Sequence, residues 1–141
     1  MFEYSPTDII VQWGPTTLDG FMEGTFVNGE RDEDSVTKHV GSKGTVTATL
    51  NANVSGMVAC TIVQGDPTNA LLLAALFKQE RTGKLEKRPF SITDLAGTML
   101  VTAPNAWIRR PANAEFAKEA VGREWIFDCD KLLYLPGIAL K

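Results

Sequence analysis

The sequence predicts a mainly β fold, a sandwich or barrel of about eight short strands with one packed α-helix. Short runs of alternating apolar and polar residues recur along the 141 residues, and glycine- or proline-containing turns separate them. Only one segment, residues 67–82, carries apolar residues at helical spacing. The length suits a single domain over residues 1–141 that is large enough to bury a core.

The first half of the chain is expected to supply four strands. A run rich in β-branched residues ends at Gly14-Pro15, and Asp19-Gly20 marks the next turn. Further on, a run of strict alternation can place Val58, Cys60 and Ile62 on one face. The predicted strands in this half are Thr7–Trp13, Phe21–Val27, Thr45–Leu50 and Ser55–Val63.

The helix is predicted over residues 67–82. Asp66 or Thr68 is a suitable N-cap, and Pro67 suits the first turn. Gly83 is expected to end the helix, and the basic residues Lys78 and Arg81 suit its last turn. The expected apolar stripe consists of Leu72, Leu73, Leu76 and Phe77.

The second half is predicted to be β again. Phe90–Asp94 and Thr98–Thr102 bracket a hairpin, and a further strand containing Trp107 and Ile108 stops at Pro111. The segment Arg123–Cys129 alternates, which places Trp125, Phe127 and Cys129 on one face. The only cysteines, Cys60 and Cys129, lie in strand-like patterns without a CxxC spacing. We expect two buried free thiols and a reducing compartment.

A charged segment, residues 28–44, is expected to form an arm outside this body. Its residues Glu30, Arg31, Asp32, Glu33 and Asp34 carry four negative charges and one positive charge, which equals the net charge of −3 of the whole chain. Nothing in this distribution indicates a basic nucleic-acid-binding surface. Three roles compete for the arm: a metal site, a cluster of catalytic carboxylates, or a surface that contacts another subunit.

The residue patterns argue against reaction chemistry. The single histidine, His39, has no recognisable nucleophile motif nearby, and one histidine is too few for a zinc site. The Asp-Glu-Asp run lacks the spacing and the glycine position of a calcium loop. No metal, cofactor or enzymatic activity is therefore expected. The longest apolar stretch, Ala70–Phe77, is far too short to span a membrane, so no membrane anchoring is expected.

Several segments together resemble the tail tube proteins of contractile-tailed bacteriophages, over about residues 8–130. The most specific are GTFV followed by ERDEDSVTKHVGSKG, then AWIRRPANAEFAKE, and finally REWIFDCD. The family is similar in architecture to type VI secretion tube proteins. The resemblance implies hexameric rings in which strands of each protomer join a continuous inner β-barrel, with the helix outside. It also implies a tube within a contractile sheath that conducts DNA into the host.

The resemblance further implies partners and a location. The partners would be other copies of the chain, the sheath protein, baseplate and tail terminator proteins, the tape measure protein before ejection, and DNA in passage. The chain would reside in the virion tail after assembly in the host bacterial cytoplasm. Two alternatives are a tube subunit of a bacteriocin or secretion machine, and a solitary β-barrel that binds ligands or single-stranded nucleic acid.

Carried to this sequence, the resemblance makes the charged arm a device for contacts between subunits and between rings. Its expected counterpart is the basic segment Lys78–Arg88, which carries five basic and two acidic residues. The candidate contact residues are Glu30, Arg31, Asp32, Glu33, Asp34, His39, Lys43, Lys84, Lys87 and Arg88. A DNA conduit should have a neutral or negative wall, which suits the sequence pI of about 5.1. The candidate lumen-facing residues are Thr45, Thr47, Thr49, Asn51 and Thr61.

Overall fold

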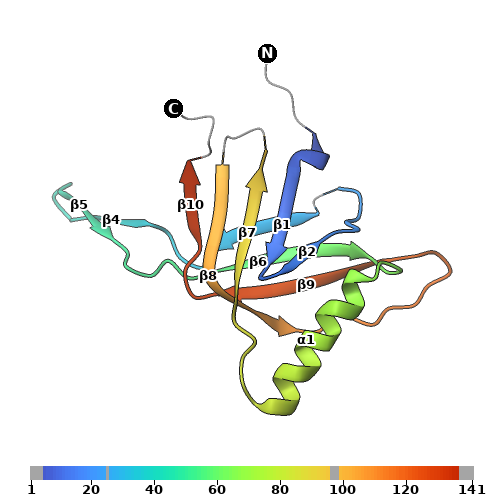
Figure 1. Ribbon diagram of the computed structural model, residues 1–141. Helices are drawn as coiled ribbons and strands as arrows, with labels where there is room; N and C mark the ends of the chain where they lie inside the picture. Colours follow the sequence, from blue (N-terminus) through green and yellow to red (C-terminus); the bar gives the residue numbers. More distant parts are fainter. Residues whose placement is uncertain (1–4, 25, 96–98, 137–141) are drawn as a thin grey trace.

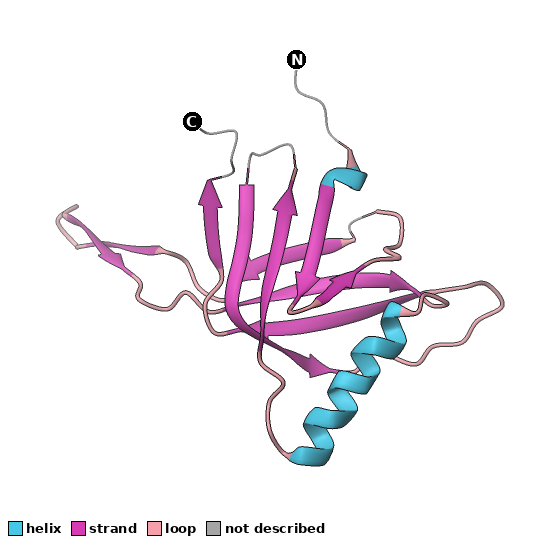
Figure 2. Cartoon of the chain, in the orientation of Figure 1, coloured by secondary structure: helices cyan, strands magenta, loops and turns pink. Residues whose placement is uncertain are grey.

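The described residues form ten strands and one α-helix, as the prediction of a mainly β fold with one helix requires (Figures 1 and 2). The computed structural model describes residues 5–24, 26–95 and 99–136. A short 3-10 turn, Pro6–Asp8, precedes the first strand. The elements are β1 (Ile9–Trp13), β2 (Thr16–Leu18), β3 (Val27–Arg31), β4 (Val36–Val40), β5 (Val46–Leu50), β6 (Gly56–Val63), α1 (Thr68–Thr82), β7 (Arg88–Asp94), β8 (Met99–Arg110), β9 (Gly122–Cys129) and β10 (Leu133–Pro136).

Eight strands form one antiparallel sheet in the order β2-β1-β7-β8-β9-β6-β3, and β10 pairs with β8 beside this path. The remaining strands, β4 and β5, pair only with each other and project away from the body (Figure 1). Within the eight-stranded sheet, β2, β3 and β10 pair on one side only among the described residues.

The long strand β8 turns this sheet into two layers. Its first part pairs with β7 and β10, whereas its last part pairs with β9. The register shifts between Arg88 and Phe90 on the β7 side and between Ile108 and Arg110 on the β9 side, and such irregularities bend a strand. The sequence analysis predicted two separate strands here, Thr98–Thr102 and one containing Trp107 and Ile108, whereas β8 runs through both and includes Pro104. In Figure 1 the layer β1-β7-β8-β10 stands across the layer β9-β6-β3.

The core fills the angle between the two layers. The ring centroid of Phe127 on β9 lies 5.2 Å from that of Trp13 on β1 and 5.0 Å from that of Phe90 on β7. Alternation along β6 buries Val58, Cys60 and Ile62 completely, as predicted. The predicted inward face of β9 is also confirmed, because Trp125, Phe127 and Cys129 are all buried.

The helix α1 covers one end of the β9-β6 layer. It ends at Gly83, whose left-handed φ of 70° is the conformation expected of a C-terminal glycine. Its contact with the body is narrower than predicted, because Leu72 and Leu76 are buried whereas Leu73 and Phe77 are about half or more exposed. The predicted stripe was therefore wrong for these two residues, and Ala75 completes the buried face instead.

Two other predictions need correction. The segment Phe21–Val27 is not a strand, since only Phe21 makes an isolated bridge, to Ile62, and β3 begins at Val27. The arm was predicted to comprise residues 28–44, but residues 28–31 belong to β3 in the main sheet. The projecting hairpin instead runs from Val36 to Leu50. The turn of the predicted hairpin after Phe90–Asp94 includes residues 96–98, which lie outside the described residues.

Candidate subunit-contact surfaces

No group of three metal-ligating side chains comes together in the described part of the chain. Both cysteines are free and buried, as expected, and burial raises the pKa of their thiols, that of Cys129 to about 12. His39 is exposed on the projecting hairpin. No helix between residues 5 and 136, within the described ranges, combines the length and apolar character that a bilayer crossing requires.

The acidic residues lie at the root of the arm, where they join its two connections to the body. Asp32 accepts a hydrogen bond of 2.8 Å from the Ser55 hydroxyl, and Glu33 accepts one of 2.7 Å from the Asn51 amide. These bonds link the segment that leaves β3 to the segment that returns to β6. Asp32 and Glu33 therefore connect the two ends of the arm, and all four acids, Glu30, Asp32, Glu33 and Asp34, are exposed.

Arg31 fastens this root to the C-terminal strand. Its Nε donates a 2.9 Å hydrogen bond to the backbone oxygen of Leu132, and its guanidinium lies 5.4 Å from the ring centre of Tyr134. The Tyr134 hydroxyl in turn donates to the backbone oxygen of Gly29 at 2.9 Å. Arg31 therefore binds within its own chain, and its predicted contact with another subunit stays a prediction.

The hairpin β4–β5 has two chemically different faces, and every residue in both strands is exposed. The register pairs Val36 with Leu50, Lys38 with Ala48 and Val40 with Val46, so one face is apolar around a central lysine. The other face is polar and pairs Thr37 with Thr49 and His39 with Thr47. Residues 36–50 contain two lysines, Lys38 and Lys43, and no acidic residue, so the hairpin itself is basic.

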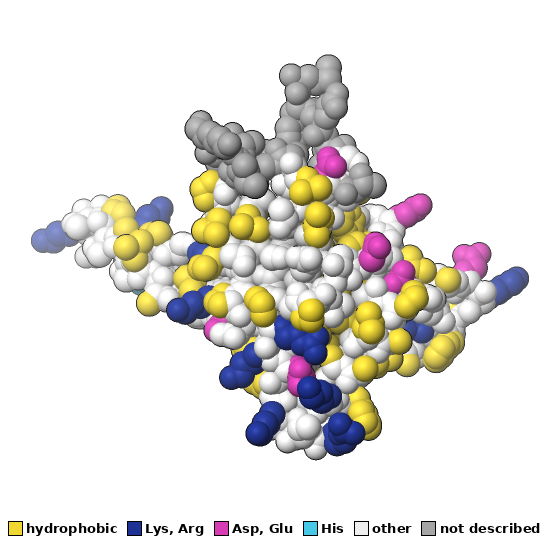
Figure 3. All heavy atoms as spheres, viewed as in Figure 1, with side chains coloured by type: hydrophobic (Ala, Val, Ile, Leu, Met, Phe, Trp, Pro, Cys, Tyr) yellow, Lys and Arg dark blue, Asp and Glu magenta, His cyan; other side chains and the backbone are white. Residues whose placement is uncertain are grey.

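The predicted basic counterpart is already partly paired. Lys78 and Arg88 each approach a carboxylate oxygen of Glu86 at 3.3 Å, and these contacts, led by the bond with Lys78, lower the pKa of Glu86. The Arg88 guanidinium also lies 4.4 Å from the ring centre of the buried Trp13. Lys84 and Lys87 are exposed. In Figure 3 basic side chains gather over α1 and the loop after it, well away from the arm, so one chain does not bring the two predicted charged surfaces together.

The candidate lumen residues fall into two places. Thr47 and Thr49 lie on β5, and Thr45 and Asn51 flank that strand, so these four belong to the arm. Thr61 lies on β6 of the main sheet, opposite Glu124 of β9. The structure therefore does not assemble the five residues into one surface of a single chain.

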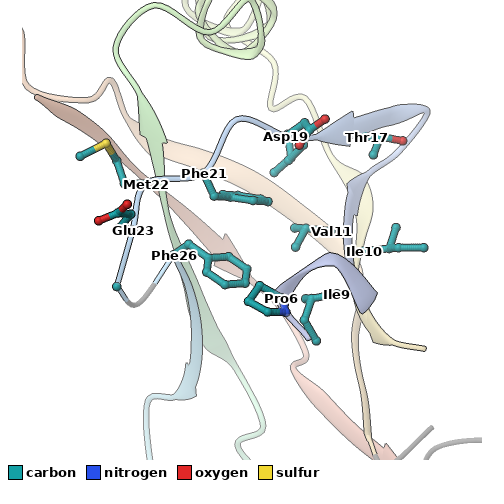
Figure 4. Close-up of a pocket in the computed structure, with 12 residues that line it drawn as sticks. Pro6, Ile9, Ile10, Val11, Thr17, Asp19, Phe21, Met22, Glu23 and Phe26 are labelled. Atoms are coloured by element: carbon teal, nitrogen blue, oxygen red, sulfur yellow. The ribbon is translucent and has the colours of Figure 1, made fainter. Parts of the chain in front are cut away.

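Sequence reasoning missed an apolar pocket of about 720 Å³ beside β1 and the segment that leads into β3 (Figure 4). The rings of Phe21 and Phe26 lie with centroids 5.1 Å apart and face Pro6, Ile9 and Val11. Asp19 and Glu23 are the charged lining residues, and the lining contains no Lys or Arg. The pair of phenylalanines between glycine turns was the available signal, but it was interpreted as a strand.

Comparison with known proteins gives matches over most of the chain. A family model described as "Bacteriophage PhiTE tail tube protein" matches residues 18–135. "Structural protein ORF10" of Pseudomonas phage KPP10 is 27% identical over 123 residues, which cover 86% of this chain and 70% of that protein.

Solved structures of contractile injection systems share the fold. The anti-feeding prophage cap matches with a TM-score of 0.61 and 10% identity, covering 97% of this chain and 93% of the other. A chain of the PVC sheath–tube complex of an extracellular contractile injection system, in its extended state, matches with a TM-score of 0.60 and 15% identity, covering 96% of this chain and 93% of the other. At these identities the likeness establishes the fold alone.

Proposed function

Because the chain belongs to the bacteriophage PhiTE tail tube protein family, we propose that it forms the inner tail tube of a contractile tail. Copies assemble into hexameric rings, the rings stack inside the sheath, and the lumen conducts DNA into the host. The role is structural, and no residue acts as a catalyst. The tube is built in the host cytoplasm and becomes part of the virion.

The observation that carries this proposal is the β4–β5 hairpin, which pairs with no other strand in the part of the chain that the structure describes. A two-stranded hairpin alone is marginally stable in water, and this one exposes Val36, Val40, Val46 and Leu50. The edge strand β3 offers further unpaired backbone groups at the rim of the sheet. Addition of strands between protomers would satisfy such an edge, and ring closure would remove it as a site of aggregation.

The charged residues would set register more than affinity in this assembly. Exposed ion pairs contribute about 0–1 kcal/mol each, so contacts of Glu30 or Asp34 with Lys84 and Lys87 of another copy would favour one docking position. Among the candidate lumen residues, Thr61 lies on the main sheet. Thr45, Thr47 and Thr49 lie on the projecting arm, so they would line a lumen only if the arm extended into a neighbouring ring.

The proposed partners follow the same assembly. A sheath would surround the tube, and terminator and baseplate proteins would bind its two ends. The tape measure protein would fill the lumen before DNA does. Support comes from the matched structures, whose names include a sheath–tube complex and a cap that terminates a tube.

Electron microscopy of the purified protein across concentration, with light-scattering mass on the same sample, tests the proposal. Rings or hollow tubes with six-fold end views are expected, and a monomer at every concentration would argue against self-assembly. Replacing Asp32, Glu33 and Asp34 by Lys should leave the protomer folded and shorten or abolish the tubes. The matched control reverses the exposed acids Glu115 and Glu119, and its tubes should be normal. Normal tubes from the arm variant would remove these acids from the mechanism.

A second candidate function is a tube of an injection system that carries no DNA. The fold similarity to the anti-feeding prophage cap favours it. Nucleic acid in purified particles distinguishes the two functions, since only a phage tail attached to a filled head delivers DNA.

A further inference from the structure

We propose that the apolar face of the β4–β5 hairpin of one copy docks into the Phe21–Phe26 pocket of a neighbouring copy. This inference rests on the proposed function, because it identifies the surface that receives the arm during assembly. Sequence reasoning had given that role to the basic segment Lys78–Arg88.

The two surfaces are chemically complementary. The hairpin face presents Val36, Val40, Val46 and Leu50, which are between 48% and 83% exposed. The pocket offers aromatic and aliphatic walls, and its volume of about 720 Å³ lies within the range of sites that bury a partner group. Removing these apolar side chains from water on both sides would drive the contact.

The charges match as well. Lys38 stands between Val36 and Val40 on the apolar face, and the hairpin contains no acidic residue. The pocket carries Asp19 and Glu23, both exposed, and no basic residue. Docking of the hairpin would therefore place the Lys38 ammonium beside the carboxylates of Asp19 and Glu23. In Figure 3 the basic tip of the arm and the acidic side chains near the pocket lie on opposite sides of the molecule.

The placement of the two surfaces suits contact between copies. The arm leaves the body where Arg31 pairs with Gly56, at one end of β6. The pocket lies at the other end, where Phe21 bridges Ile62. Six residues of strand separate these ends by roughly 20 Å, and the arm projects away from the body rather than back across it (Figure 1). Two different surfaces on opposite sides make a head-to-tail contact, which generates rings or filaments.

The docking is tested by chemical cross-linking of the assembled protein with a short bis-maleimide. The double variant Val40→Cys, Met22→Cys places one thiol on the apolar face and one at the pocket. We expect a ladder of covalent multimers, because each copy links to the next through both thiols. Mixing the two single variants should give dimers only. The native cysteines are buried and should stay unlabelled, so wild-type protein should give no ladder.

The matched control is His39→Cys, Met22→Cys, which moves the first thiol by one residue to the polar face. Its ladder should be several-fold weaker. Tubes that form without the Val40 ladder, or a His39 ladder of equal yield, would overturn the docking and leave the tube intact. Dimers from Val40→Cys alone would indicate arm-to-arm contact instead. A protein that stays monomeric and uncross-linked at the highest concentration counts against both the docking and the tube.

Discussion

The β6–β9 layer and the β4–β5 hairpin are both antiparallel strand pairs, but they differ in how far their apolar side chains are buried within the chain. On β6, Val58 and Ile62 are completely buried against the rest of the same chain. On β5, Val46 and Leu50 alternate in the same way and are 58% and 83% exposed. Alternation therefore predicts a strand with one apolar face, and it does not say whether that face is buried within the same chain.

The largest loss of folding stability is expected in the β6–β9 layer. Trp125 is 1% exposed, and its Nε1 donates a 3.0 Å hydrogen bond to Asn69 of α1. Trp125→Ala should lower the free energy of unfolding by about 3–5 kcal/mol, because it leaves a large cavity. Urea denaturation measures this loss. Trp107→Ala, at a partly exposed position on β8, is the control and should cost much less; equal losses would mean that the layer is not the core.

A smaller loss is expected at the junction between this layer and the helix. The Asn69 amide nitrogen donates to the backbone oxygen of Val63 at 2.8 Å, while its oxygen accepts from Trp125. Asn69→Ala leaves the buried indole N–H of Trp125 without its acceptor and removes the hydrogen bond to Val63 in the turn between β6 and α1. The free energy of unfolding should fall by about 1–3 kcal/mol. The exposed Asn113→Ala should change it little, and a neutral Asn69→Ala would show that packing alone holds the helix in place.

The sequence predicted those parts of the fold that depend on a local pattern of residues. The inward faces of β6 and β9 and the end of α1 at Gly83 follow from alternation and from the left-handed glycine. The bend in β8 was not predictable, because it depends on different strands pairing with its two halves. The strand β10 was missed because it is a short edge whose pairing with β8 is entirely tertiary.

For the candidate contact surfaces, too, the sequence predicted only what depends on local composition. The composition of residues 30–34 identified the root of the arm, but their bonds to Ser55 and Asn51 depend on where the chain returns. The pocket could not be predicted, since Pro6, Ile9 and Phe26 meet only after β1 and β3 are in place. The sequence analysis assigned residues 36–44 to the charged arm and Thr45–Leu50 to a separate strand, so the apolar face that β4 and β5 share was not predicted.

The smallest change in folding stability is expected for the β4–β5 hairpin, whose apolar side chains are exposed. Val40→Ser and Leu50→Ser change exposed side chains on two strands that, among the described residues, pair with each other and with no other strand. The free energy of unfolding of the monomer should therefore stay within about 0.5 kcal/mol of the wild type. Urea denaturation below the assembly concentration measures it, and the buried Val58→Ser is the destabilised control. The same two arm variants should assemble only at higher concentration, because assembly is where their apolar surface is covered. A monomer that loses stability as Val58→Ser does would mean that the hairpin packs on its own body, and the contrast between the two regions would then disappear.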